Sequence, residues 1–391
     1  MTPSARVQAA IEILDEVIAS ARDDGPPADT IIQRYFKTRR YAGSKDRRAV
    51  RELAFRAIRR CGERPDSGRT AMLGLADDDA LLLDLFDGSP HGPVVREPAE
   101  KPAAASIIPQ WIQPLLSEQV ATGEWPALLE RAPLDLRVNA AKAARDEIAS
   151  QIPDAKPTTL SPWGLRLPAD SKIDDLPAFA EGLIEIQDEG SQLIALACQP
   201  TNGMRILDLC AGAGGKALAL AAVSPDAEII ASDTNRARLA QLAPRSGRAG
   251  AAIATRLIDG GREAAQLADL EGQCDVVLVD APCSGSGTWR RNPEGRWRLT
   301  SDRLDRLAEL QKRLLDLAAP LVKPGGALVY ATCSIIRAEG ADQARNFLGR
   351  HSSWQVHDVS INGGRADGPG KLLTPGHDAT DGFFVARFIR S

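Results

Sequence analysis

Two cysteines and a carboxylate follow apolar segments that are typical of buried strands, and these residues could do chemistry together. The run 276–279 ends at Asp280, with Cys283 shortly after it, and the run 327–332 ends directly before Cys333. A cysteine thiolate is a nucleophile, and a carboxyl group can hold or transfer a proton. Ligands bind at the carboxyl ends of strands in open α/β sheets. If the two strands are neighbours, both thiols and Asp280 therefore share one cleft.

Two basic segments could bind phosphate groups. The first lies just beyond Cys283 and contains Arg290, Arg291, Arg296 and Arg298. The second runs over residues 34–60, where aromatic side chains are interleaved with arginines and lysines. Basic residues among aromatic ones favour contact with phosphates and bases, whereas a solvated surface explains both segments nearly as well.

The composition is that of a folded globular protein. The chain has 391 residues, of which 43% are hydrophobic and 26% charged, and its formal net charge is −4. This length predicts two or three domains. We find no run of about 18 uncharged apolar residues, and the first apolar pattern contains acids, so we expect neither a membrane span nor a secretory signal. We therefore expect a cytoplasmic monomer.

The six cysteines form no CxxC pair, and the four histidines have no ligand spacing. This arrangement predicts no metal site and reduced thiols. For Cys61, Cys198 and Cys274 the simplest interpretation is a small buried hydrophobic side chain.

From residue 183 onward, strands and helices alternate as in a doubly wound parallel α/β sheet. We expect strands at 205–209, 228–233, 252–258, 275–279 and 327–332, with a final pair near 355–359 and 383–389. The clearest helix is predicted over 303–317, and residues 324–326 predict a turn into the strand that follows.

The preceding half divides into three parts. Residues 1–90 predict a helical domain, with helices over 5–20, 44–61 and 71–86, and residues 91–105 predict a linker rich in proline. Residues 106–182 predict a small α+β module with a helix after Ile108, a strand at 134–138 and a helix at 142–151. Further strand pieces are expected at 158–160 and 164–167. The last domain is then 183–391.

The strand at 205–209 runs into a glycine-rich loop, for which three interpretations compete. A phosphate loop fails, because Cys210 stands where its first glycine belongs and Ala217 follows the lysine. A dinucleotide site fits Gly212, Gly214 and Ala217, with Asp233 about twenty residues on. For S-adenosylmethionine, the loop would meet the methionine end and Asp233 the ribose hydroxyls. Asp259 and Asp280 add further strand-end carboxylates, and a hydride-transfer enzyme has no need of two thiols.

These residues resemble a known family. The segments DLCAGAGGK, ASDTNRARL, LIDG, DAPCSGSGTWRRNPEGRW, YATCSI and DGFFVARF are similar to the successive motifs of the Nop/Sun RNA cytosine-5 methyltransferases. The stretch from LRVNAAKAARDEI to GLIEIQDEGSQLIALA resembles their small RNA-recognition-like module. YAGSKDRRAVRELAFRAIRR resembles a divergent NusB-like domain, as in RsmB-type 16S ribosomal RNA enzymes.

The resemblance implies a class I S-adenosylmethionine-dependent methyltransferase, with Cys333 as nucleophile, Cys283 assisting proton removal and release, and Asp280 and Lys216 contacting the base. It implies that the substrate is 16S ribosomal RNA. The RNA backbone would be bound by Arg290, Arg291, Arg296 and Arg298. The cofactor would contact Cys210, Ala211, Gly212, Ala213, Gly214, Gly215, Lys216, Asp233, Arg238, Asp259 and Asp280. The family loop usually reads CAAPGGK. Gly212 and Ala213 depart from it, which frees the backbone and can weaken cofactor affinity.

The implied chemistry needs these residue types. Carbon 5 of cytosine is a poor nucleophile, and thiolate addition to carbon 6 turns the ring into an enamine that reacts at carbon 5. A carboxyl group near nitrogen 3 and a second group for proton removal complete the requirement. Two alternatives stay open at this point: a retired RNA-binding or ribosome-assembly protein, and a dinucleotide oxidoreductase.

Overall fold

The computed structural model describes residues 1–23 and 25–391, and these form two compact units. The helical unit comprises residues 1–116, 125–130 and 288–301. The α/β unit comprises residues 117–124, 131–287 and 302–391. Within the described residues, no helix has the length and apolar character that crossing a bilayer requires.

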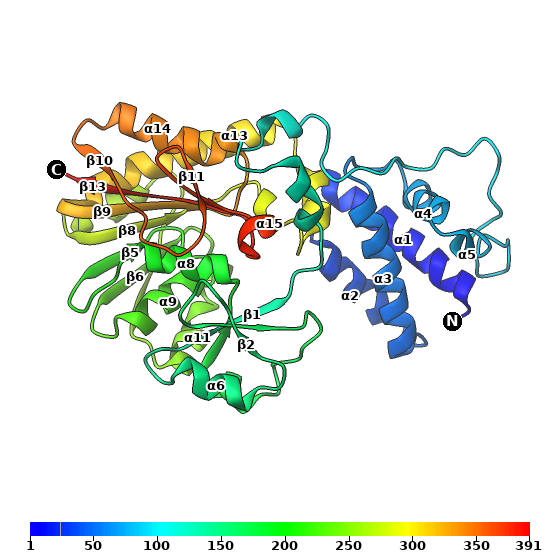
Figure 1. The fold of residues 1–391 in the computed structure, drawn as a ribbon, viewed down its shortest axis with the longest axis horizontal. Coiled ribbons are helices and arrows are strands. Elements are labelled where there is room, and N and C mark those ends of the chain that lie inside the picture. The colour runs from blue at the N-terminus through cyan, green and yellow to red at the C-terminus, as the bar shows by residue number, and fades with distance from the viewer. Residues whose placement is uncertain (24) are drawn as a thin grey trace. The chain divides into compact units, whose positions relative to one another are not determined.

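A nine-stranded sheet forms the centre of the α/β unit (Figure 1). Its parallel part has the order β7-β6-β5-β8-β9, and β13 then pairs antiparallel with β9. The strands are β5 (Arg205–Asp208), β6 (Glu228–Asp233), β7 (Ile253–Leu257), β8 (Cys274–Asp280), β9 (Val322–Thr332) and β13 (Phe383–Arg390). The strand order reverses between β5 and β8, which is where ligands bind in doubly wound sheets. The predicted fold class is confirmed for this unit.

Helices cover both faces of the sheet (Figure 1). On one face lie α8 (Glu189–Ala197), α9 (Gly215–Val223) and α11 (Leu242–Ala249), and on the other lie α13 (Ser301–Ala318) and α14 (Ala341–Arg350). The short helices α10 (Arg236–Leu239), α12 (Glu263–Gln266) and α15 (Pro375–Asp378) complete the unit. Alanine and leucine dominate the buried face of α9, so that this helix packs closely on the strands.

The sheet differs from the prediction at two places. Residues 324–326, predicted as a turn, lie within β9, where the pairing jumps from Cys274–Val322 to Val276–Ala327 and the extra residues bulge out. The hairpin of β11 (Arg365–Asp367) and β12 (Gly370–Leu373) was not predicted, because such short strands carry little hydrophobic periodicity. The expected final pair is present as β10 (Trp354–His357) and β13.

A second, four-stranded antiparallel sheet belongs to the same unit, in the order β2-β3-β1-β4. It contains β1 (Leu134–Val138), β2 (Lys156–Pro157), β3 (Gly164–Leu167) and β4 (Ile184–Ile186), with α6 (Arg145–Gln151) and α7 (Pro177–Ala180). The strand predicted at 158–160 is wrong. The helix predicted after Ile108 is also wrong, since 3-10 turns at 113–115 and 122–128 replace it and prolines interrupt both.

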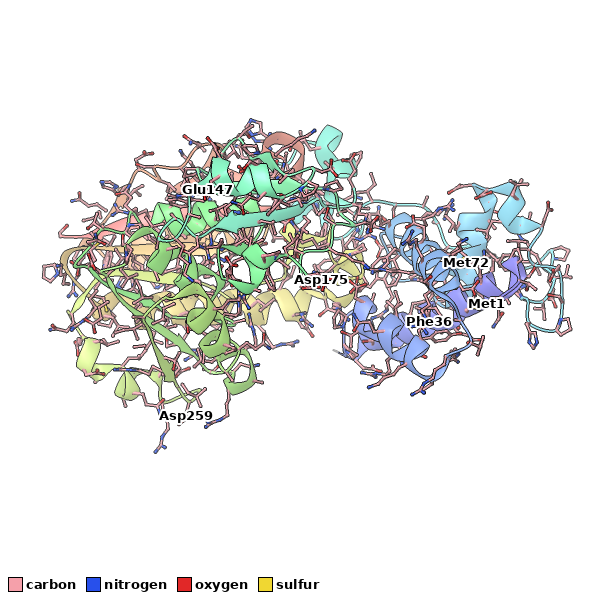
Figure 2. The ribbon with its side chains drawn as sticks, turned by 90° about the horizontal axis from the view of Figure 1, so that it is seen from below. Met1, Phe36, Met72, Glu147, Asp175 and Asp259 are labelled. Carbon is pink, nitrogen blue, oxygen red and sulfur yellow. The ribbon has the colours of Figure 1, made fainter. Side chains whose placement is uncertain are left out.

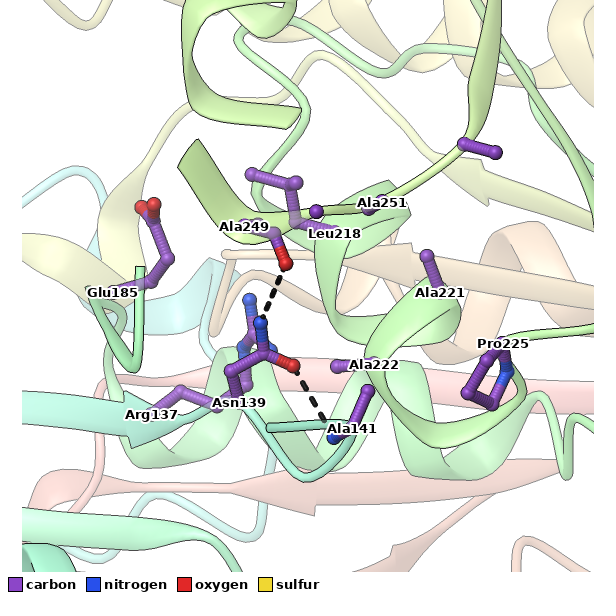
Figure 3. Close-up of a pocket in the computed structure, with 12 residues that line it drawn as sticks. Arg137, Asn139, Ala141, Glu185, Leu218, Ala221, Ala222, Pro225, Ala249 and Ala251 are labelled. Atoms are coloured by element: carbon purple, nitrogen blue, oxygen red, sulfur yellow. Dashed lines mark hydrogen bonds between the residues drawn. The ribbon is translucent and has the colours of Figure 1, made fainter. Parts of the chain in front are cut away.

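The small sheet is fastened to the large one by polar contacts around a cavity of about 110 Å³ (Figure 3). The Asn139 amide donates to the carbonyls of Gly182 and Ala249, at 3.1 and 3.0 Å. The Glu185 carboxylate, on β4, pairs with Arg245 and Arg248 of α11. None of the predicted site residues lines this cavity, so we assign it to the junction of the two sheets.

The helical unit contains α1 (Pro3–Arg22), α2 (Ala28–Thr38), α3 (Ser44–Arg60), α4 (Gly68–Asp77) and α5 (Ala80–Leu83) around one hydrophobic core. Helix α2 was not predicted, and the run predicted over 71–86 is broken into α4 and α5 by the acidic residues 77–79. The segment predicted as a linker is tied to the helices. The amides of Ala103 and Ser106 donate to the carbonyls of Thr70 and Arg60, each at 2.9 Å.

Residues 288–301 also belong to the helical unit, and they include the predicted RNA-binding arginines. Arg296 is 1% exposed, and its guanidinium donates to the carbonyls of Pro293 and Ile58 at 2.9 and 2.7 Å, and to that of Ile107. Burial lowers the pKa of Arg296 to about 10. Arg298 donates to the carbonyls of Gly25 and Pro26, both at 2.8 Å. A guanidinium enclosed by protein carbonyls does not face a ligand, which is at odds with the predicted RNA contact of Arg296.

We expect Arg296→Ala to lower the free energy of unfolding of the helical unit by roughly 2–4 kcal/mol, because it leaves several buried carbonyls without donors. Urea unfolding followed by tryptophan fluorescence measures this, since Trp297 lies in the same core. Arg34→Ala, at an exposed position of α2, is the matched control. Unchanged stability together with weakened RNA binding would instead assign Arg296 to the RNA.

Candidate active site

The two predicted thiols meet at the carboxyl edge of the large sheet. Strands β8 and β9 are parallel neighbours, with Asp280 opposite Ala331 in the register. The Sγ atoms of Cys283 and Cys333 are 3.4 Å apart. The Gly287 amide donates to the Cys333 carbonyl at 3.0 Å, which holds the two loops together. The sequence-based expectation that neighbouring strands deliver both thiols to one place is therefore confirmed.

Cys283 is kept as a thiol in this arrangement. The hydrogen bond with Cys333 raises the pKa of Cys283 well above its ordinary value, and burial and the negative charge of Glu339 add to the effect. The amide of Gly285 opposes it. Two adjacent sulphur atoms do not both ionise easily, because like charges at this distance repel. One thiolate is therefore the most that this pair supports at neutral pH.

Lys216 and Asp280 form an ion pair next to the thiols. The Nζ atom of Lys216, in the first turn of α9, donates to Oδ2 of Asp280 at 2.6 Å. Burial by itself lowers the pKa of Lys216, but Asp280 and the neighbouring Cys333 outweigh it, so the pKa is raised. Lys216 is therefore a cation that faces both the carboxylate and the thiol region.

The glycine loop between β5 and α9 turns through left-handed conformations. Gly212 has φ +57° and Gly214 has φ +81°. A Cβ at Gly212 would meet the guanidinium of Arg238, and one at Gly214 would meet the side chain of Leu242. Only glycine takes both positions without strain. The glycines thus let the loop turn tightly against Arg238 and Leu242, and the loop leads into the start of α9, where backbone amides can face a ligand.

Asp233 fixes this loop from the end of β6. Its Oδ2 accepts from the Gly212 amide at 2.7 Å, and its Oδ1 accepts from the Asn235 amide at 2.6 Å. Asp259 lies further out. It is exposed on the loop after β7, where its side chain and amide bond to Gln266, and Figure 2 shows it at the outer edge of the α/β unit. Asp233 therefore contacts the glycine loop, whereas the contacts of Asp259 are with Gln266.

Three residues at the site were not among the predicted site residues, although Asp208 opens the segment DLCAGAGGK. Arg245 donates to the carbonyl of Ala213 at 2.6 Å and pairs with Glu185 at 2.9 Å, so that it holds the loop against the small sheet. Asp208 ends β5 at 1% exposure, and burial and nearby Asp280 raise its pKa to about 7. Glu339 is 0% exposed beside the thiols. A single arginine or carboxylate without a motif is not distinguishable from a surface residue in one sequence.

The described residues hold no cluster of histidine, cysteine and acidic side chains suited to a metal ion. A doubly wound sheet that presents a glycine loop and carboxylates at its switch point is shared by dinucleotide-binding enzymes and class I methyltransferases. The two thiols beside the Lys216–Asp280 pair favour the methyltransferases, which take their methyl group from S-adenosylmethionine.

Comparisons with known proteins agree with this class. A family described as 16S rRNA methyltransferase RsmB/F matches residues 195–389. Ribosomal RNA small subunit methyltransferase B of Salmonella paratyphi B is 37% identical over 295 residues, which cover 73% of this chain and 67% of that protein. The chain therefore belongs to the RsmB/F family of 16S rRNA methyltransferases.

Solved structures share the fold. The crystal structure of PH0851 covers 100% of this chain and 99% of its own, with a TM-score of 0.74 and 23% identity. The structure of NSun6 from Pyrococcus horikoshii with SFG covers 72% of this chain and 97% of its own, with a TM-score of 0.64 and 19% identity. The two structures extend the likeness in fold beyond the matched family segment.

Proposed function

We propose that this protein methylates carbon 5 of a cytosine in 16S ribosomal RNA through a covalent adduct on Cys333. The observation that carries the proposal is the 3.4 Å approach of two thiols beside the Lys216–Asp280 pair, at the edge where the cofactor loop ends. A retired protein would have no reason to hold two thiols and an ion pair in this geometry. A dinucleotide oxidoreductase leaves both thiols unexplained, and family membership favours methyl transfer.

Each side chain takes one role. The Cys333 thiolate adds to carbon 6 of the cytosine, and Asp280 lies near nitrogen 3, where the Lys216 cation paired with it offsets the charge that develops. Lys216 neutralises Asp280 between turnovers and contacts the base. Bound S-adenosylmethionine supplies the methyl group to carbon 5. Cys283 gives its own proton to solvent and takes up the carbon 5 proton, the bond between Cys333 and carbon 6 breaks, and the Cys333 thiolate is restored.

The cofactor is held by the backbone of residues 210–216. We infer that Asp233 receives the ribose hydroxyls, with Arg238 and Asp259 bounding the adenosine side. Asp233 already accepts two amide hydrogens, so it is rigid enough to orient a ligand hydroxyl. Arg238 is exposed and borders Gly212, which places it at the mouth of the loop.

RNA contact is proposed for Arg291 and the basic face of the helical unit, whereas Arg290 is buried like Arg296, at 5% exposure. Exposed cations follow each other along α2 and α3, and Tyr41 between these helices is 73% exposed. A cytosine must leave its stack before a thiol can reach its ring, which favours a single-stranded or bulged site. We also propose that residues 1–90 form a divergent NusB-like domain and that residues 106–182 form an RNA-recognition-like module.

The experiment that tests the function is methyl transfer from labelled S-adenosylmethionine to total RNA of a strain lacking this protein. Digestion to nucleosides and mapping of the label locate the product. Label as 5-methylcytosine at a single position of 16S RNA supports the proposal. Label in another base, or cofactor binding without label in any RNA, would contradict it.

We expect Gly212→Ala to weaken S-adenosylmethionine binding about 5- to 30-fold, because a left-handed conformation costs an L-residue about 1–2 kcal/mol. Isothermal titration with the cofactor measures this. Gly349→Ala, which meets open space on α14 and has an ordinary φ, is the control. An unchanged dissociation constant for Gly212→Ala would mean that the loop rearranges on binding.

A further inference from the structure

Glu339 is a fully enclosed carboxylate that none of the steps above uses. It ends the 3-10 turn Arg337–Glu339 directly after the Cys333 loop, at 0% exposure. Enclosing a carboxylate is costly unless hydrogen bonds replace its water. The residues that supply these bonds are therefore informative about what the carboxylate does.

The donors come from both thiol loops. Ser284, which follows Cys283, donates to Glu339 through its amide at 2.8 Å and through its hydroxyl at 2.5 Å. Ser334, which follows Cys333, donates through its hydroxyl at 2.6 Å. One carboxylate thus binds the immediate neighbours of both cysteines. Charge-assisted hydrogen bonds of this kind are roughly twice as strong as neutral ones.

Neighbouring residues reinforce the bridge. The amide nitrogen of Gln311, on α13, donates to Glu339 and to the Pro282 carbonyl, both at 3.0 Å. The Tyr330 hydroxyl donates to the Glu339 carbonyl at 2.7 Å, which fixes the residue from β9. Glu339 therefore joins the two thiol loops in an enclosed network, beside the direct contacts of Gly287 with Cys333 and of Ser286 with Ser334.

The charges around the thiol pair are unequal. The ionisable groups that surround Cys283 and Cys333 are Lys216, Asp280, Glu339 and Tyr330. The negative charge of Glu339 opposes ionisation of Cys283, whereas the Lys216 cation and Cys333 influence each other directly. A nearby anion opposes a thiolate. Glu339 therefore acts on Cys283 before any substrate binds.

We propose that Glu339 is a positioning residue that clamps the two thiol loops together and, with burial and the contact of Cys333, keeps Cys283 protonated, so that Cys333 alone is the nucleophile. This inference rests on the proposed function. Once Cys333 is bonded to carbon 6, its sulphur no longer shares a proton with Cys283, and the largest cause of the raised pKa of Cys283 is gone. Cys283 then releases its proton to water and takes the carbon 5 proton as a thiolate.

The test uses full-length Glu339→Gln, which keeps the size of the side chain and removes its charge. Iodoacetamide alkylation at varied pH, read at the Cys283 peptide, reports the ionisation of that thiol. We expect the alkylation midpoint of Cys283 to move to lower pH. We also expect kcat to fall about 10- to 100-fold through misplacement of the loops, with KM for S-adenosylmethionine unchanged. Glu271→Gln, at an exposed position, is the control.

Glu339→Asp separates the two effects. It retains the charge but is shorter, so the alkylation midpoint should stay near that of the wild type while kcat stays low. If Glu339→Gln does not fold, Ser284→Ala and Ser334→Ala each remove one hydroxyl that donates to Glu339 and should each lower kcat. An unchanged midpoint in Glu339→Gln, or unchanged kcat in both serine variants, would overturn the proposal. Loss of the proposed function is seen separately, as a wild-type protein that labels no RNA while the alkylation shift persists.

Discussion

Cys333→Ala is expected to lower methyl transfer to RNA by at least about 10³-fold, because the thiolate that activates carbon 5 is removed and no other group replaces it. Cofactor binding should be unchanged, since Cys333 directly follows β9 while the glycine loop follows β5. Single-turnover methylation with labelled cofactor measures the rate, and titration calorimetry measures cofactor binding.

Cys274→Ala is the matched control for this loss. Cys274 is a buried thiol on β8, outside the loops that carry Cys283 and Cys333, so its removal should leave the rate near that of the wild type. Methylation by Cys333→Ala at the normal rate would assign the nucleophile to Cys283. A loss in Cys274→Ala as large as in Cys333→Ala would point to unfolding, and circular dichroism would reveal it.

Cys283→Ala is expected to form the adduct but to release it slowly. The Cys333 thiolate can still attack, whereas the group that removes the carbon 5 proton is missing, so turnover should fall about 10²- to 10⁴-fold. A protein–RNA complex that survives denaturing electrophoresis should accumulate. Its formation is the direct measurement, because it separates a failure of release from a failure of attack.

Cys283→Ala/Cys333→Ala is the control for the trapped complex. This double variant should form no such complex, because the sulphur that bonds to carbon 6 is absent. A complex in the double variant would show attachment through another residue. Fast turnover by Cys283→Ala without a complex would remove Cys283 from the release step, and Asp280 would become the group to test.

The strands and the motif loops could be predicted from the sequence because each depends on local pattern. Strand β6 was predicted with the bounds that the structure shows, and β5, β7 and β8 within two residues at each end. Runs of β-branched residues specify buried parallel strands wherever they occur. The proximity of Cys283 and Cys333 could also be predicted from the sequence, since the carboxyl ends of neighbouring parallel strands lie at one edge of the sheet.

Contacts between residues far apart in the chain could not be predicted. Arg296 belongs to a cationic run, yet it lies inside the helical unit among the carbonyls of Ile58 and Ile107. Glu339 has no motif of its own, and its role depends on Ser284 and Ser334 being brought to it. A guanidinium or a carboxylate looks the same in a sequence whether water or protein surrounds it. The sequence by itself determined the order of strands along the chain and the chemistry they carry, and only the tertiary structure decided which charges are enclosed, because burial depends on every element at once.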